Sequence, residues 1–184
     1  MSKTLSEMVP LNSSARDFSL WEPLTNKTKN LENLKGEKGT VIMFICNHCP
    51  YVVHIRKQLI SLVSEYQKNG IQFIGINSND VTTYPQDNPE LMIEDCEKYH
   101  YPFVYLFDET QEVAKNYDAS CTPDFFVYNK ELELVYRGRF DASTPGNNNP
   151  VTGVDLKKAL DALLNDEPIL REQFPSMGCN IKWK

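Results

Sequence analysis

Two cysteines, a histidine and a proline follow directly on an apolar run, as Cys-Asn-His-Cys-Pro at residues 46–50. The run has the length and β-branching of a buried strand, and Pro50 suits the first turn of a helix. Cys49 would then lie at the helix N-terminus, where unpaired amides and the helix dipole favour a thiolate, the reactive form of cysteine. Cys46 is close enough in sequence to form a disulfide with Cys49, and His48 can add positive charge. The segment therefore predicts a redox pair.

Two other interpretations of these cysteines stay open. Free cysteine is often buried as a small hydrophobe, so the pair can belong to the core. Cys46, Cys49 and His48 could also bind zinc together with a distant cysteine, because four such ligands make a structural zinc site. The chain has a single C-x-x-C and no second pair at zinc-finger spacing. The redox interpretation is therefore preferred, and no metal is expected.

A second informative stretch is Cys121-Thr122-Pro123, which directly precedes an apolar run. X-Pro bonds are the only peptide bonds that readily become cis, and a cis proline at a strand start marks a tight turn. An ordinary loop proline is the alternative. The position predicts a turn that carries Thr122 and Pro123 to the beginning of a strand.

The elements that must position these residues alternate between strands and helices. Apolar runs predict strands at 41–45, 71–77, 103–107, 124–128 and 132–136. Helical spacing and end signals predict helices at 50–69, 89–100, 110–117 and 155–164. Alternating β and α units imply a parallel sheet between helices, to which the last two strands add a hairpin. Chemistry in such sheets takes place beyond the carboxyl ends of the strands, which is where residues 46–50 lie.

Length and charge narrow the class of protein. The chain has 184 residues, enough for one domain with one core, and a net charge of −6, which argues against a nucleic-acid binder. No apolar stretch reaches the ~18 residues of a membrane span, and the N-terminus lacks the apolar centre of a secretory signal. Five cysteines, an odd number, do not suit a disulfide framework. A cytoplasmic protein with reduced thiols is expected.

The order of elements, with C-x-x-C after the first central strand and Thr-Pro before the hairpin, resembles the thioredoxin fold. Ala-Arg-Asp-Phe-Ser-Leu at 15–20 is similar to the opening motif of the redoxin branch, which includes AhpC/TSA, peroxiredoxin-like and thiol-disulfide oxidoreductase proteins. Cys-Asn-His-Cys-Pro-Tyr-Val at 46–52 and Gly-Cys-x-Ile-Lys-Trp at 178–183 resemble a bacterial subgroup. The resemblance implies an α/β thioredoxin fold, a central mixed sheet flanked by helices, at residues 14–165, with an N-terminal arm at 1–13 and a tail at 166–184 packed on the domain.

The resemblance also implies roles for single residues, with departures from both family patterns. Cys49 matches the attacking cysteine of thioredoxins and of peroxiredoxins. Cys46 stands where peroxiredoxins have the threonine that orients peroxide, and Pro50 follows the second cysteine instead of separating the pair. Thr122-Pro123 stands near the place of the peroxiredoxin arginine, as in thioredoxins. The motif is therefore peroxidase-like around Cys49 and thioredoxin-like at Pro123.

We predict a thiol-disulfide oxidoreductase in which the Cys49 thiolate attacks a disulfide, Cys46 resolves the mixed disulfide and Pro123 shapes the groove for the partner sulfur. Other possible resolving thiols are Cys179, on an apolar tail that could dock near Cys49, and Cys121, beside the proline. The residues expected to tune the site are His48, Pro50 and Thr122.

Two alternatives stand beside this prediction. One is a peroxiredoxin-like antioxidant thiol peroxidase, with Cys49 peroxidatic and Cys46 or Cys179 resolving. The other is a redox-inert or zinc-holding binding module. No cofactor is expected, because exchange needs only sulfur. The expected partners are a disulfide-containing protein or a small thiol or peroxide, with a thioredoxin or glutathione system as electron donor, and neither nucleic acid nor membrane; no oligomeric state is predicted.

Overall fold

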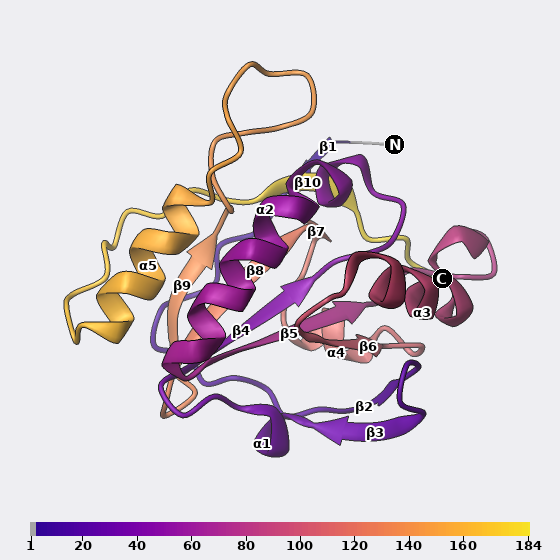
Figure 1. Cartoon of the computed structure of the whole chain (residues 1–184), viewed down its shortest axis with the longest axis horizontal. Helices are drawn as coiled ribbons and strands as arrows, with labels where there is room; N and C mark the ends of the chain where they lie inside the picture. The colour runs from indigo at the N-terminus through magenta and orange to yellow at the C-terminus, as the bar shows by residue number, and fades with distance from the viewer. Residues whose placement is uncertain (1–2) are drawn as a thin grey trace.

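A mixed sheet forms the centre of the protein, whose computed structural model describes residues 3–184. Within this range the sheet has seven strands in the order β3-β2-β6-β5-β4-β8-β9 (Figure 1). The strands β4, β5 and β6 run parallel, whereas β2, β3, β8 and β9 each pair antiparallel with their neighbours. Their bounds are β2 (Ser19–Glu22), β3 (Lys27–Asn30), β4 (Gly39–Phe44), β5 (Ile71–Asn77), β6 (Val104–Phe107), β8 (Asp124–Asn129) and β9 (Leu134–Gly138).

Helices cover both faces of this sheet, as expected from the sequence. In a strand, successive side chains point to opposite faces. Val41 and Met43 of β4 therefore pack toward α2, α3 and α5, while Ile42 and Phe44 pack toward α1 and α4. No helix within residues 3–184 is long and apolar enough to cross a membrane. The helices are α1 (Leu31–Leu34), α2 (Pro50–Tyr66), η1 (Gln67–Asn69), η2 (Pro85–Asp87), α3 (Pro89–Tyr99), α4 (Glu112–Asn116) and α5 (Val154–Leu164).

A second, small sheet joins the beginning of the described chain to its end. It consists of β1 (Lys3–Leu5), β10 (Met177–Asn180) and β7 (Cys121–Thr122), all antiparallel, with β10 in the middle. Figure 1 shows β10 beside β7, close to the point where α2 begins. The sequence does not predict these strands, because two to four residues carry too little pattern. This sheet brings the tail to the region of the cysteines.

Helix α2 buries the face that its sequence predicts. The apolar residues at helical spacing are all buried in the core between α2 and the sheet, namely Val52, Ile55, Leu59, Leu62, Val63 and Tyr66. This packing holds α2 firmly on β4. The start of the helix, which carries the candidate nucleophile, is thereby fixed relative to the sheet.

Replacing Leu62 by alanine is expected to lower the free energy of unfolding by about 2–5 kcal/mol, because the side chain is 0% exposed and leaves a cavity. Val53→Ala on the outer face of the same helix, where Val53 is 49% exposed, is the matched control and should change it by less than about 0.5 kcal/mol. Chemical denaturation of both variants measures the two values. Equal small losses would contradict the assignment of the buried face.

Candidate active site: a cluster of thiols beside Thr122

The segment with the two cysteines and the segment with Pro123 meet because of strand register. Cys46 to Cys49 follow the carboxyl end of β4, and Phe44 at that end pairs with Asp124 at the beginning of the antiparallel strand β8. The residues just before β8 therefore lie beside those just after β4. The Thr122–Pro123 peptide bond is cis, which confirms the prediction from the sequence.

Cys49 is the N-cap residue of α2, with Pro50 at the first helical position, as predicted. Its backbone is extended, at φ −62° and ψ 122°, and its side chain is 0% exposed. In its protonated form the thiol donates a hydrogen bond to the Thr122 carbonyl oxygen, with 3.1 Å between sulfur and oxygen. No side-chain hydrogen bond caps the helix at Cys49, but an interaction with the Val52 backbone contributes to a lowered pKa of the thiol. The helix start therefore helps to stabilise a thiolate at this position.

The surroundings of Cys49 lower the pKa of its thiol from 9.0 to about 5. The largest cause is the hydrogen bond from the Cys46 thiol, which stabilises the thiolate, while burial acts in the opposite direction. Further hydrogen bonds lower the pKa, from the side chains of Cys179 and Thr122 and from the backbone amide of Val52. At neutral pH, Cys49 is therefore the thiolate of the cluster.

The ultraviolet absorbance of thiolate should rise in one step with a midpoint near pH 5 when the reduced protein is titrated. The sign follows from the lowered pKa, since the proton is lost above about pH 5 and regained below it. Cys49→Ser should lack this step, and Cys96→Ser should keep it, because burial raises the pKa of Cys96 to about 12. A step that survives in the Cys49→Ser protein would assign the thiolate to another residue.

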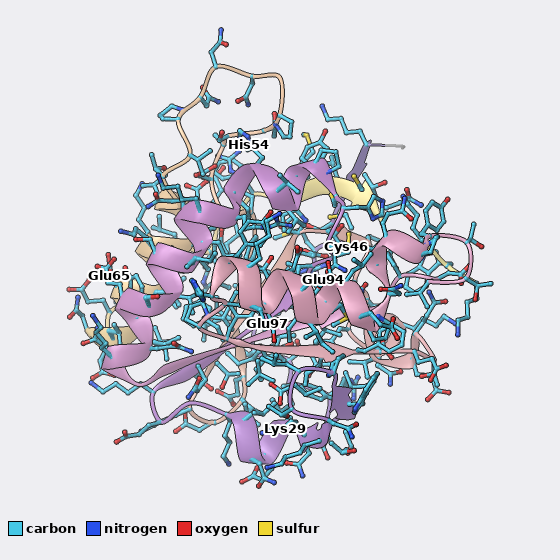
Figure 2. All side chains as sticks on the ribbon, turned by 45° about the vertical axis from the view of Figure 1, so that its right-hand side comes forward. Lys29, Cys46, His54, Glu65, Glu94 and Glu97 are labelled. Carbon is cyan, nitrogen blue, oxygen red and sulfur yellow. The ribbon has the colours of Figure 1, made fainter. Side chains whose placement is uncertain are left out.

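Cys46 differs from Cys49 in its charge environment. Its sulfur lies 3.6 Å from the Thr122 hydroxyl, and its pKa is raised well above 9.0. The causes are the hydrogen bond to Cys49, then burial, then the negative charge of Asp87. Figure 2 shows Cys46 in the interior, below the first turn of α2. The structure thus pairs one easily ionised thiol with a neighbour that keeps its proton.

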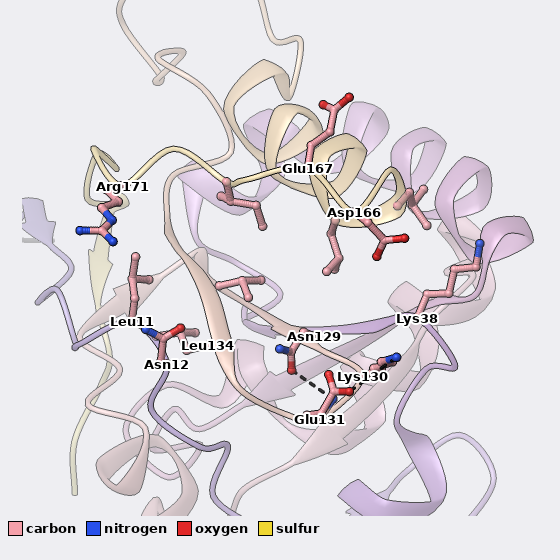
Figure 3. A pocket seen from close by; sticks show the side chains of 14 residues that line it. Leu11, Asn12, Lys38, Asn129, Lys130, Glu131, Leu134, Asp166, Glu167 and Arg171 are labelled. Atoms are coloured by element: carbon pink, nitrogen blue, oxygen red, sulfur yellow. Dashed lines mark hydrogen bonds and ion pairs between the residues drawn. The ribbon is translucent and has the colours of Figure 1, made fainter.

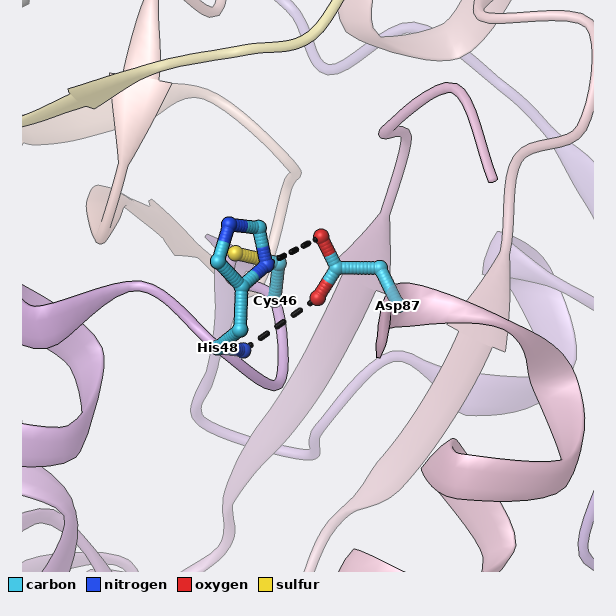
Figure 4. Close-up of side chains that lie close together, drawn as sticks. All are labelled: Cys46, His48 and Asp87. Atoms are coloured by element: carbon cyan, nitrogen blue, oxygen red, sulfur yellow. Dashed lines mark hydrogen bonds and ion pairs between the residues drawn. The ribbon is translucent and has the colours of Figure 1, made fainter. Parts of the chain in front are cut away.

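His48 is bound to Asp87, a residue that the sequence does not single out. The His48 Nδ1 lies 2.7 Å from Asp87 Oδ2, and the backbone amides of Asn47 and His48 donate to Asp87 Oδ1 at 2.9 and 3.2 Å (Figure 4). The Asn79 side chain donates to Asp87 Oδ2 at 2.8 Å. Asp87 is 0% exposed and therefore fixes the loop between the two cysteines from beneath. No motif marks it, because it lies on another segment, at the end of the short helix η2.

Cys46, His48 and Asp87 bring one sulfur, one ring nitrogen and one carboxylate oxygen to within 4.8 Å of one another. Zinc holds its nitrogen and oxygen ligands at about 2.0–2.1 Å, so two of them on one tetrahedral ion stand about 3.3 Å apart. The 2.7 Å between His48 and Asp87 is instead the length of a direct hydrogen bond. We therefore interpret this group as a support of the loop.

The remaining predicted thiols lie at different distances from the reaction centre. Cys179 pairs with Thr122 across β10 and β7, and its side chain is hydrogen-bonded to Cys49. The Cys121 thiol is directed at the carbonyl oxygens of Pro123 and Ser176, at 3.7 and 4.0 Å. The structure therefore brings Cys46, Cys49 and Cys179 together. Cys121 lies beside them on β7, the strand that pairs with β10.

The comparison with protein families agrees with this site. The model of the AhpC/TSA family matches residues 11–137. The chain belongs to the AhpC/TSA family. A curated relative of this AhpC/TSA protein is the thiol-disulfide oxidoreductase ResA of Halalkalibacterium halodurans, 25% identical over 115 residues, or 62% of this chain. The aligned region covers 60% of ResA, so this chain spans less than two thirds of that relative's length.

Solved structures resemble this AhpC/TSA protein over more of its length. An uncharacterized conserved protein from Geobacillus kaustophilus is 49% identical, with a TM-score of 0.98 over 100% of this chain and 97% of that chain. The thioredoxin domain of a thiol-disulfide oxidoreductase from Bacteroides vulgatus is 13% identical, with a TM-score of 0.63 over 83% of this chain and 99% of that chain. At such low identity the likeness shows the fold alone. The thioredoxin fold predicted from the sequence is thereby confirmed.

A large cavity of the AhpC/TSA protein lies away from the thiols. Its volume is about 780 Å³, and Figure 3 shows it between the end of α5 and the turn that joins β8 to β9. Lys38, which lines it, precedes β4, whereas Cys46 follows that strand. The described residues that line the cavity include neither a cysteine nor a histidine. The candidate active site therefore lies at the opposite end of β4.

Proposed function

We propose that this AhpC/TSA protein is a thiol-disulfide oxidoreductase. The Cys49 thiolate attacks one sulfur of a partner disulfide, which forms a mixed disulfide with Cys49 and releases the other partner sulfur as a thiolate. The Cys46 thiolate then attacks the Cys49 sulfur, which releases the rest of the partner and leaves a Cys46–Cys49 disulfide. The partner gains two electrons, and the protein loses two.

The observation that carries this proposal is the environment of the Cys49 sulfur. It lies at a helix N-cap, accepts hydrogen bonds that lower its pKa to about 5, and has a second thiol, Cys46, beside it. A thiolate supplies the nucleophile, and an adjacent thiol supplies the group that resolves the mixed disulfide. Cys49 and Cys46, three residues apart, therefore supply both the nucleophile and the resolving thiol that exchange needs.

His48, Pro50 and Thr122 have supporting roles in this proposal. Thr122 directs its carbonyl oxygen at Cys49 and its hydroxyl at Cys46. Pro50 begins the helix whose N-cap residue is Cys49. His48 holds the intervening loop through Asp87 and, when protonated, adds a positive charge near the Cys46 thiol. Pro123 leads from this group into β8 and lines the adjoining surface with Tyr51 and Met177.

Peroxide reduction is the second candidate, favoured by the match to the AhpC/TSA family. Fast peroxide reduction needs hydrogen-bond donors aimed at the developing oxyanion. The arginines near the site in sequence have other partners, since Arg56 binds Asp95, Arg137 binds Asp124 and Arg139 binds Asp155. With Cys46 in place of a hydroxyl donor, disulfide exchange is the better supported reaction. Peroxide consumption no faster than that of free cysteine would leave exchange as the activity.

The partners follow from the chemistry of exchange. A disulfide in a protein or a small molecule is the oxidant, and a dithiol donor of the thioredoxin or glutathione type would restore the two thiols. A reducing compartment such as the cytoplasm suits the reduced form of the five cysteines. The net charge of −6 gives no basis for nucleic acid as a partner.

A single-turnover experiment tests the proposed reaction. The reduced protein is mixed with one equivalent of dithiobis(nitrobenzoate), a disulfide that releases a coloured thiolate for each half displaced. Cys49 attack should release the first half and resolution the second, both faster than with free cysteine at neutral pH because Cys49 is already ionised. If the colour appears no faster than with free cysteine, Cys49 is not an activated nucleophile and the proposal of exchange fails.

A further inference from the structure

Strand pairing sets the position of Cys179 from both sides. Cys179 lies opposite Thr122 on one edge of β10 and opposite Lys3 on the other. At the preceding residue, Gly178, a Cβ atom would lie 2.0 Å from the Thr122 carbonyl oxygen, closer than real Cβ contacts. Glycine is therefore required for this close approach. The same Thr122 carbonyl accepts the hydrogen bond from Cys49.

Side chains and backbone groups also hold β10 at its two ends. Before the strand, the Ser176 hydroxyl donates to the Gly138 carbonyl oxygen at 2.8 Å, and the Ser176 amide donates to Ser6 Oγ at 2.8 Å. After the strand, the Lys182 amide donates to Asn79 Oδ1 at 2.9 Å. Ser176, Asn79 and Lys182 are all buried. Cys179 thus belongs to the packed structure and is held at the reaction centre.

The Cys49 sulfur consequently has a thiol neighbour on each of two segments. Cys46 comes from the loop after β4 and Cys179 from the tail, and both donate to the Cys49 sulfur. Burial and the neighbouring Cys49 raise the pKa of both thiols, but Asp87 adds a further negative charge near Cys46, whereas Lys182 places a positive charge near Cys179 that favours its ionisation. A resolving thiol must ionise before it attacks. Cys179 has both the position and a favourable nearby charge for that step.

We propose that Cys179 is a second resolving thiol and that the oxidised protein exchanges between a Cys46–Cys49 and a Cys49–Cys179 disulfide. The inference rests on the proposed exchange function of Cys49. The Cys179 thiolate attacks the Cys49 sulfur, either in the mixed disulfide, which releases the partner thiolate, or in the Cys46–Cys49 disulfide, which releases the Cys46 thiolate. The second reaction moves a disulfide within the chain without net oxidation, and the proton lost by Cys179 is taken up by the released thiolate.

Trypsin separates the two disulfides cleanly. Cleavage after Lys38 and Arg56 puts Cys46 and Cys49 in one peptide, 39–56, and cleavage after Arg171 and Lys182 puts Cys179 in another, 172–182. A Cys49–Cys179 bond joins the two peptides, whereas a Cys46–Cys49 bond stays within the first. The proteins to compare are wild type, Cys46→Ser, Cys179→Ser and the double variant, with Cys121→Ser and Cys96→Ser as controls.

Each reduced protein receives one equivalent of dithiobis(nitrobenzoate), and remaining thiols are alkylated before digestion. The expected result is that Cys46→Ser still releases both coloured halves and shows the joined peptides, while the double variant releases only the first half and keeps the reagent on Cys49. The two controls should behave as wild type. If Cys46→Ser keeps the reagent on Cys49 and its Cys179 is alkylated, Cys179 does not resolve. If wild type releases no first half, exchange itself fails and the inference with it.

A variant that retains the thiol tests the role of strand pairing. Gly178→Ala introduces the Cβ that would meet the Thr122 carbonyl. Gly146→Ala, the control, introduces one with nothing within 4 Å, and its backbone strain, at φ +93°, falls in an exposed loop outside β10. Gly178→Ala should lose the joined peptides and keep the bond within peptide 39–56, and Gly146→Ala should show both. Circular dichroism confirms that each variant is folded. Joined peptides at the wild-type level in Gly178→Ala would show that β10 does not deliver Cys179.

Discussion

Replacing Cys49 by serine is expected to reduce the rate of disulfide exchange to that of the reagent alone, a loss on the order of 10³-fold or more, as when a nucleophile is removed from a catalytic unit. A hydroxyl at the N-cap keeps the helix start intact but is not ionised at neutral pH. The remaining thiols cannot replace it, because burial raises the pKa of Cys121 and of Cys179. Release of the coloured thiolate in a single turnover measures the loss.

The control for this variant is Cys96→Ser. Cys96 lies in α3, is buried, and has no role in the proposed reaction. Its replacement should leave the exchange rate unchanged. If Cys49→Ser retained more than a small fraction of the wild-type rate, the attacking sulfur would have to be sought elsewhere, and Cys46 would be the first candidate.

Replacing Arg137 by methionine is expected to lower the free energy of unfolding by about 3–5 kcal/mol, the range found when one partner of a buried ion pair is removed. The Arg137 side chain is 0% exposed and lies 2.8 Å from Asp124 Oδ1. It also donates to the Glu7 carbonyl oxygen at 2.9 and 3.1 Å and packs over the Phe126 ring. Methionine fills similar space but leaves the Asp124 carboxylate without its partner. Chemical denaturation measures the loss.

Arg139→Met is the matched control for the buried pair. Arg139 binds Asp155 at 2.6 Å, but its side chain is 31% exposed. The expected loss is about 1 kcal/mol or less, because water screens partly exposed pairs. Similar losses in the two variants would mean that burial of Arg137 does not decide its contribution.

The loss in free energy of unfolding caused by Arg137→Met should also depend on pH. Burial raises the pKa of Asp124 from 3.8 to about 6, although Arg137 acts in the opposite direction. Because the folded pKa lies above the unfolded one, the stability contributed by Asp124 is lost as pH rises through about 6. Removal of Arg137 increases this loss of stability, because the ionised Asp124 carboxylate is then buried without a positive partner. The difference between wild type and Arg137→Met should therefore be larger at pH 8 than at pH 5.

The helices and strands that could be predicted from the sequence are those whose own residues show an apolar pattern. Helix α2 repeats apolar residues over several turns, and β4 and β5 are continuous buried runs, so their existence and order follow from pattern. The position of Cys49 at a helix start and the cis bond before Pro123 are likewise set by local chemistry. These features were enough to locate the candidate site.

The parts that were not predictable depend on tertiary pairing. Strands β1, β7 and β10 are too short to be marked by alternation and exist because they pair with one another. Asp87 ends the short helix η2, and only the folded chain shows that it binds His48 and the amide of Asn47. The hydrogen bond between Cys179 and Cys49 depends on the same pairing. Sequence spacing could therefore name Cys179 only as one candidate among several.

The pairing of β10 with β1 and β7 also determines when the three thiols can come together during synthesis of the chain. Cys46 and Cys49 leave the ribosome well before Cys179, and β4 and β8 can complete the sheet around them while the tail is still untranslated. A nascent chain at that stage holds the pair of thiols but lacks the third. The complete cluster can form only after residues 177–180 have emerged and paired with the N-terminal strand. Oxidation of an unfinished chain therefore cannot produce the Cys49–Cys179 disulfide, and the tail thiol joins the other two only when residues 177–180 have paired.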